Sequence, residues 1–218
     1  VSGISLQDDD PAASRSLKNS QAAVRLRGRA RDVDYGIYYL NLYHSVPVLK
    51  EKNPAGNLTK RFLFEPTAAN LNALVTAGAA GDDLRLTKAY PRVNAAGFDW
   101  ETVLGVFGLR GEAAVFWGLP YLRDDFSYTE KDQVSFGIGF DHTTSDQWFF
   151  DFKYIQDYIL NYEGLYGVEK APFSFAGTVS KNFSRGRIFL NLDWMWQVSH
   201  EDLMLNPEAD RKSVVEGK

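Results

Sequence analysis

Arginine occupies every second position of one short segment, at Arg25, Arg27 and Arg29. Because successive side chains of a strand point to opposite faces of a sheet, this spacing places the three positive charges on one face. Like charges side by side repel one another unless water, acidic neighbours or an anionic solute compensates them. Two interpretations follow: a solvated strand face with acidic neighbours, or a basic stripe along the wall of a pore that favours anions.

Residues suited to catalysis or metal binding are sparse. His44, His142 and His200 are widely separated and lack the spacing of metal ligands. The run Asp8-Asp9-Asp10 is followed by neither the Gly nor the Glu of an EF-hand loop, so we interpret it as a solvated loop. The sequence contains no Gly-x-Ser-x-Gly elbow, phosphate-binding loop or dinucleotide fingerprint. We therefore expect no enzyme, no metal and no cofactor.

The composition narrows the class of protein. Of the 218 residues, 14% are aromatic and 18 are Gly, which favours strands and turns over helices. Cys is absent, which excludes disulfides and thiolate chemistry. The formal net charge of -4 argues against nucleic acid as a partner. No apolar run reaches the roughly 18 residues of a membrane-spanning helix, but strands that are apolar on one face only are compatible with a membrane β-barrel.

Polar and apolar residues alternate with a period of two along much of the chain. From Trp148 to Tyr154 the even positions are aromatic, whereas Asp151 and Lys153 fall between them. This alternation is the signature of a strand. Most of the predicted strands have about ten to twelve residues, longer than the usual five or six and close to the nine to eleven of a tilted membrane-spanning strand. The eight predicted strands lie near 21–30, 34–43, 92–103, 107–117, 132–142, 147–158, 171–182 and 186–197.

Short and long connections alternate between these strands. The long ones are roughly 44–91, 118–131 and 159–170, and the others have only a few residues. Bacterial outer-membrane barrels have this asymmetry, whereas a Greek-key sandwich has no reason to produce it. The sequence therefore predicts an all-β, antiparallel up-and-down transmembrane β-barrel over 21–200, with tight turns at one end. Residues 1–20 and 201–218 are expected to be loops or truncated segments.

The orientation of the two strand faces follows from the cost of charge in lipid. An Arg or Lys that faces the middle of a bilayer costs about 2–4 kcal/mol, so the charged face must meet water. The residues predicted to line a pore are Arg25, Arg27, Arg29, Asp99, Glu101, Arg110, Glu112, Asp151, Lys153, Arg187 and Asp193. The residues predicted to face lipid or to form an aromatic girdle are Trp100, Trp117, Trp148, Phe150, Phe152, Trp194 and Trp196.

The longest connection, 44–91, is predicted to contain a helix. Pro66 suits a first helical position, and Leu71, Leu74 and Val75 form one apolar face before Gly78. Long connections are usually functional or disordered. The segment either folds over the mouth of the channel and constricts it, or remains a mobile surface loop.

Several segments resemble porin-like outer-membrane β-barrel proteins of Gram-negative bacteria, including the alginate-export-like proteins. The resemblance is carried by Gly97 to Trp100, Phe107 to Ala114, Trp148 to Phe152 with Tyr158, and the hairpin from Arg25 to Tyr39. It implies an outer-membrane channel for passive or facilitated diffusion of small polar solutes, anionic ones included, within a barrel larger than this chain. Outer-membrane lipid would be a partner, and homo-oligomers are compatible with it. The alternatives are a non-conducting membrane-anchored barrel, such as an adhesin, and a soluble lipocalin-like binder with its aromatic residues inside.

Overall fold

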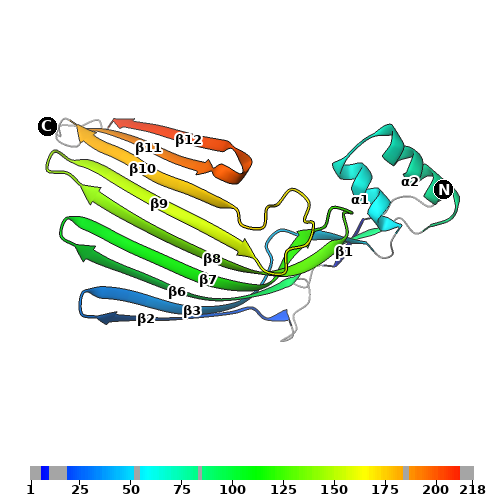
Figure 1. Ribbon diagram of the computed structural model, residues 1–218, viewed down its shortest axis with the longest axis horizontal. Coiled ribbons are helices and arrows are strands. Elements are labelled where there is room, and N and C mark those ends of the chain that lie inside the picture. Colours follow the sequence, from blue (N-terminus) through cyan, green and yellow to red (C-terminus); the bar gives the residue numbers. More distant parts are fainter. Residues whose placement is uncertain (1–5, 10–18, 52–54, 83–84, 184–186, 212–218) are drawn as a thin grey trace, which may run out of the picture.

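The computed structural model describes residues 6–9, 19–51, 55–82, 85–183 and 187–211. Its main feature is a nine-stranded sheet in the order β12-β11-β10-β9-β8-β7-β6-β3-β2, in which all neighbouring strands are antiparallel (Figure 1). The strands are β2 (Ala22–Ala30), β3 (Val33–Tyr43), β6 (Arg92–Leu104), β7 (Phe107–Leu122), β8 (Tyr128–Thr143), β9 (Trp148–Ile159), β10 (Phe173–Phe183), β11 (Ile188–Gln197) and β12 (Asp202–Arg211).

Eight of these strands are those predicted from the period-two pattern, and they follow the predicted up-and-down order. Tight connections join β2 to β3 and β6 to β7 at one end of the sheet, which we call the turn end (Figure 1). Arg31 and Gly105 adopt positive φ values of 56° and 64° in these turns. The opposite end, from which the long connections leave, is called the loop end.

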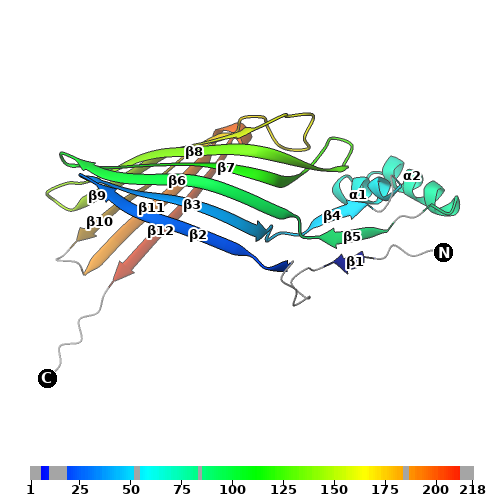
Figure 2. The same cartoon turned by 90° about the horizontal axis from the view of Figure 1, so that it is seen from below.

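The sheet is an open arch and does not close into a barrel. Figure 2 shows the middle strands at the top of the arch, with β2 and β12 below them on either side. Within the described residues, each of these two edge strands pairs on one side only. The antiparallel meander is thus established, and the closed barrel expected from the sequence is not.

The structure differs from the sequence prediction at the loop end. β7 and β8 continue through most of the predicted loop 118–131, with a register shift between Phe116 and Leu119, so that only residues 123–127 connect them. Beyond β11 the chain forms a short 3-10 helix, η3 (Val198–His200), and then β12. The prediction of a loop for residues 201–218 is therefore wrong over Asp202–Arg211.

A smaller unit extends from the loop end, away from the arch (Figures 1 and 2). Its three-stranded sheet has the order β1-β5-β4, and β1, which replaces part of the loop expected over 1–20, runs parallel to β5. The elements are β1 (Leu6–Asp9), β4 (Val48–Glu51), β5 (Leu86–Ala89), α1 (Gly56–Phe64) and α2 (Ala68–Ala79). No described helix is long and apolar enough to cross a membrane.

The predicted helix in 44–91 is α2, but it begins two residues later than expected, at Ala68 and not at Pro66. Thr67 is its N-cap and accepts a hydrogen bond from the Asn70 backbone N–H at 3.2 Å, so Pro66 precedes the cap. Leu74 and Ala77 of α2 are buried and pack with Ala55, Leu58 and Phe62. Helix α1 was not predicted from the sequence.

Aromatic contacts fix the helical unit to the loop end of the main sheet. Phe126, whose side chain is 1% exposed, stacks on Phe64 of α1 at 5.6 Å and contacts Tyr166 at 4.6 Å between ring centroids. The Lys50 ammonium of β4 lies 4.1 Å from the ring centroid of Tyr128. These contacts place the unit beyond the strand ends.

Candidate functional site

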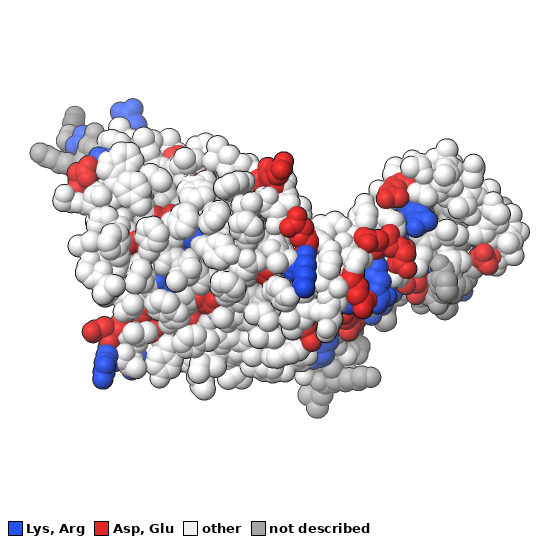
Figure 3. Space-filling model, viewed as in Figure 1, with Lys and Arg blue, Asp and Glu red and all other residues white. Residues whose placement is uncertain are grey.

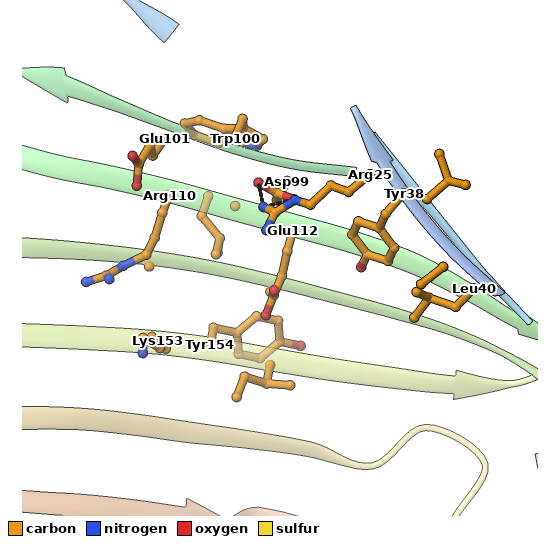
Figure 4. A pocket seen from close by; sticks show the side chains of 17 residues that line it. Arg25, Tyr38, Leu40, Asp99, Trp100, Glu101, Arg110, Glu112, Lys153 and Tyr154 are labelled. Carbon is orange, nitrogen blue, oxygen red and sulfur yellow. Dashed lines mark hydrogen bonds and ion pairs between the residues drawn. The ribbon is translucent and has the colours of Figure 1, made fainter. Parts of the chain in front are cut away.

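The two faces of the main sheet differ sharply in chemistry. Strand register places Glu101, Arg110, Gly139 and Lys153 in one row across β6, β7, β8 and β9. Figure 4 draws the side chains of Glu101, Arg110 and Lys153, and we call their face of the sheet, which lies inside the arch of Figure 2, the concave face. The opposite, convex face is shown in Figure 3, where few charged side chains appear over the strands.

A hollow of about 710 Å³ lies on the concave face and is called the groove (Figure 4). It spans β2 to β9, and its lining includes Arg25, Tyr38, Glu112 and Lys153. A second hollow of about 440 Å³ lies toward the turn end and shares Glu101 and Arg110 with the groove. No residue of 44–91 is among those that line the groove, so within the described residues the long connection does not constrict it.

The first ion pair of the groove joins two strands that are not neighbours. The guanidinium of Arg25 on β2 donates to both carboxylate oxygens of Asp99 on β6, each at 2.8 Å (Figure 4). β3 lies between these strands, and the crossing occurs at Gly36. A Cβ atom at Gly36 would lie 2.7 Å from a carboxylate oxygen of Asp99, so the pair needs a residue without a side chain there.

A second cluster is centred on Arg110. Its guanidinium binds Asp141 at 3.0 Å and also binds Asp151, whose side chain is only 8% exposed. Lys153 lies 3.5 Å from the other oxygen of Asp151. Two cations thus compensate the least exposed carboxylate of the face, because an unpaired charge at such a position is costly.

Two carboxylates of the groove remain without a partner. Glu101 lies opposite Arg110 in the strand register, but the guanidinium points away from it (Figure 4). The guanidinium binds Asp141 and Asp151 instead. Glu112 lies opposite Asp99, which is engaged by Arg25. Neither Glu101 nor Glu112 makes an ion pair or a side-chain hydrogen bond within the described residues.

The arginine row is divided among different environments. Arg25 is paired with Asp99, and Arg29 lies 3.7 Å from Asp34. Arg27 has no ion-pair partner among the described residues, and it does not line the groove. This arrangement agrees with the interpretation of a strand face with acidic neighbours and does not form an uncompensated basic stripe.

Ten of the eleven residues predicted to line a pore lie on the strands of the concave face, by register and alternation. Asp193 is one of them, but it lies on β11 and accepts a hydrogen bond from Thr178 at 2.7 Å, outside the groove. Arg187 does not join this face, because it is an exposed turn residue before β11. Sequence reasoning missed Tyr38 and Asp141, although their alternation with apolar neighbours could have indicated them.

The convex face carries a connected layer of aromatic rings. Phe152 contacts Phe140 at 5.7 Å and Trp194 at 6.0 Å between ring centroids, and Phe175 contacts Trp196 at 6.0 Å. Many of these rings are open to the surroundings, among them Trp196 with 44% exposure. All seven residues predicted to face lipid or to form a girdle lie on this face, namely Trp100, Trp117, Trp148, Phe150, Phe152, Trp194 and Trp196.

Charged side chains occur only at the two ends of this convex face, within the strands that the structure describes. Lys181 and Arg211 lie at the turn end, and Arg92, Glu130 and Asp132 at the loop end. Alternation assigns each of them to the convex face. The band between the two ends is uncharged.

Cations also stack on aromatic rings at both ends of β9. The Lys181 ammonium lies 4.7 Å from the Trp148 ring centroid, and Lys170 lies 5.2 Å from that of Tyr158. Trp148 and Tyr158 are ten positions apart, about 33 Å along an extended strand. If the strand were tilted by about 40°, this length would correspond to an apolar band of about 25 Å, the height typical of membrane barrels.

The three histidines are not brought together. His142 contacts the Val106 carbonyl at the turn end, whereas His44 contacts the Val46 carbonyl at the loop end, each at 2.8 Å. His200 lies 3.4 Å from the Gly167 carbonyl. Among the described residues there is no group of three side chains able to hold a metal ion.

No family model, no curated protein and no solved structure matches this chain. The function must therefore be argued from the sheet and its two faces.

Proposed function

We propose that this chain forms part of the wall of an outer-membrane channel for small polar solutes. Its convex face would lie against lipid, and its concave face would line a water-filled path. The observation that carries the proposal is the confinement of charge to the concave face and to the two ends of the convex face.

The energetics of burial support this orientation. Exposure of such a large uncharged aromatic face to water is unfavourable. On proteins in water, a large exposed apolar patch marks a surface that binds another molecule. In lipid, the same face needs no covering layer, and the cations stacked on Trp148 and Tyr158 would lie at the headgroup level. The ion pairs around Arg110 would remain in contact with water.

The two open edges of the arch need further strands if the sheet lies in a membrane. An unpaired backbone group in lipid costs several kcal/mol, so β2 and β12 must both pair with further strands in the membrane. These strands would come from a larger barrel. A lipocalin-like binder would need the reverse polarity, with the aromatic rings inside the arch and the charges outside it.

Labelling of adjacent residues tests the orientation. The chain has no Cys, so Phe152→Cys and Lys153→Cys each introduce a single probe on opposite faces of β9. After reconstitution into lipid vesicles, a fluorophore at position 152 should be quenched by nitroxides on lipid chains, and one at 153 by a water-soluble quencher. Phe136→Cys and Ser135→Cys on β8 form a second pair with the same expectation. Water-soluble quenching at 152 and 136 would contradict the proposal.

Conductance separates a channel from a non-conducting anchor. The complete barrel, of which this chain forms part of the wall, should produce discrete current steps when it is added to a planar bilayer in KCl solution. If the labels at positions 152 and 136 face lipid but no current steps are seen, the channel is refuted and the protein is a membrane anchor.

A further inference from the structure

We propose that the groove binds an organic cation that carries an apolar group, with Glu112 and Glu101 as the charged contacts. The inference rests on the proposed function, because the groove lies on the face that we assign to the channel wall. It also names the solute class of that face as cationic, in contrast to the anionic solutes that the arginine row indicated.

The positive charges of the groove lining are all paired, whereas two of its carboxylates are not. All three of its lining cations, Arg25, Arg110 and Lys153, are already within 3.5 Å of an aspartate. Glu101 and Glu112 line the same groove and have no partner in the part of the chain that the structure describes. The charge left for a ligand is therefore negative. An anion would meet two free carboxylates and no free cation of the lining.

The surroundings of Glu112 leave its carboxylate accessible. Its neighbour across the β7–β8 ladder is Gly137, and an added Cβ there would lie 3.4 Å from the Glu112 side chain. The absence of a side chain on β8 at this row thus keeps space beside the carboxylate. Tyr38 flanks Glu112 from the other direction (Figure 4).

The apolar part of the groove lies toward the loop end. Ala23, Leu40 and Ile155 belong to its lining, together with the Tyr38 ring. Aromatic rings attract alkylammonium groups, and apolar walls favour the hydrocarbon part of the same molecule. The volume of about 710 Å³ lies within the range of pockets that hold small organic ligands.

Titration with a matched pair of small ions tests the inference. The full chain in a nonionic detergent is titrated with benzyltrimethylammonium or with benzenesulfonate, and binding is followed by calorimetry. We expect saturable binding of the cation and none of the anion. Glu112→Gln and Glu101→Gln should each weaken cation binding about fivefold, the upper range for a partly exposed charge pair.

Two control variants keep the result interpretable. Glu112→Asp retains the charge and should bind the cation within about twofold of the parent chain. Glu65→Gln changes an exposed carboxylate outside the groove and should have no effect. Thermal unfolding verifies that each variant is folded.

The outcomes distinguish this inference from the proposed function. Equal or tighter binding of benzenesulfonate, or unchanged cation binding in Glu112→Gln, would overturn the cation site. In a KCl gradient across a bilayer, a reversal potential that indicates anion preference would also overturn it, although the channel would stand. Cation binding without lipid-facing labels would refute the channel and retain the site.

Discussion

Arg25 reaches Asp99 across an intervening strand, and Gly36 is the residue that makes this reach possible. The ion pair links β2, an edge strand, to β6, so its contribution adds to that of the backbone ladder between β2 and β3. Both side chains are partly exposed, and such pairs contribute about 0–1 kcal/mol. The larger effect of a substitution should come from steric displacement.

We predict that Gly36→Ala destabilises the sheet although Ala is otherwise preferred over Gly in strands by about 0.5–1 kcal/mol. The new Cβ would lie 2.7 Å from an Asp99 carboxylate oxygen, so the carboxylate must shift and its pair with Arg25 is weakened. The matched control is Gly137→Ala on the same face, where the added Cβ makes only ordinary contacts. Urea unfolding followed by tryptophan fluorescence should place Gly36→Ala about 1 kcal/mol below Gly137→Ala. If Gly36→Ala and Gly137→Ala were equally stable, the Arg25–Asp99 pair could not lie directly over Gly36.

Removal of Arg110 should be more costly than removal of Arg27. Arg110→Met leaves Asp151 with Lys153 alone and Asp141 without an ion pair. Because the Arg110 side chain is 40% exposed, we expect a loss of about 1–2 kcal/mol, less than the 3–5 of a fully buried pair. Arg27→Met lies on the same face and should change the free energy of unfolding by less than about 0.5 kcal/mol.

A rescue experiment separates charge from packing in this cluster. Asp141→Asn in the Arg110→Met background removes the carboxylate that would be left without an ion pair, and it should recover part of the lost stability. If the double variant is no more stable than Arg110→Met alone, loss of packing explains the effect.

The turn between β8 and β9 contains a carboxylate with a perturbed pKa. The Thr144 hydroxyl donates to Asp146 at 2.6 Å, and the Lys181 ammonium donates at 3.1 Å. These two hydrogen bonds hold the pKa of Asp146 below its ordinary value of 3.8, and the bond from Thr144 has the larger effect. A lowered pKa in the folded state means that the stabilisation is present above pH 4 and is lost as the pH falls through the lowered value.

Substitution of Thr144 should therefore raise the pKa of Asp146 toward 3.8. Thr144→Val removes the hydroxyl donor, whereas Thr144→Ser keeps it and is the control. Carboxyl carbon NMR shifts between pH 2 and 6 measure both values. A larger rise in Lys181→Met than in Thr144→Val would mean that the ammonium, not the hydroxyl, dominates.

The alternation of residue types predicted most of the main sheet because strand faces are a local property. Asp151 and Lys153 could be assigned to one face, and Phe150 and Phe152 to the other, from spacing alone. β12 was missed because Leu203, Met204 and Leu205 interrupt the alternation and Pro207 is unusual in a strand. β12 can contain Pro207 because it is an edge strand, in which a residue can lack the backbone N–H donor.

The charge pairing of the site could not be predicted from the sequence. Asp99 is 74 positions from Arg25 and compensates it only because β3 and β6 are neighbours in the sheet. Glu101 lies opposite Arg110, and only the side-chain geometry shows that this arginine binds elsewhere. Local patterns therefore predicted which residues share a face, but not which carboxylates remain free.

Phe126 should control how firmly the helical unit is held at the loop end. Its buried ring stacks on Phe64 of α1 and contacts Tyr166, so Phe126→Ala removes both of these contacts and leaves only that of Phe64 with Tyr166 at 6.1 Å between ring centroids. A buried Phe→Ala substitution costs about 3–5 kcal/mol, which here opposes docking of the unit and not formation of the main sheet. We expect cleavage within residues 44–91 by a protease to accelerate about a hundredfold, because cleavage follows the population of the open form. Phe107→Ala, at the turn end and 44% exposed, is the matched control and should leave the cleavage rate unchanged. Equal rates for the two variants would show that the aromatic contacts do not hold the unit in place.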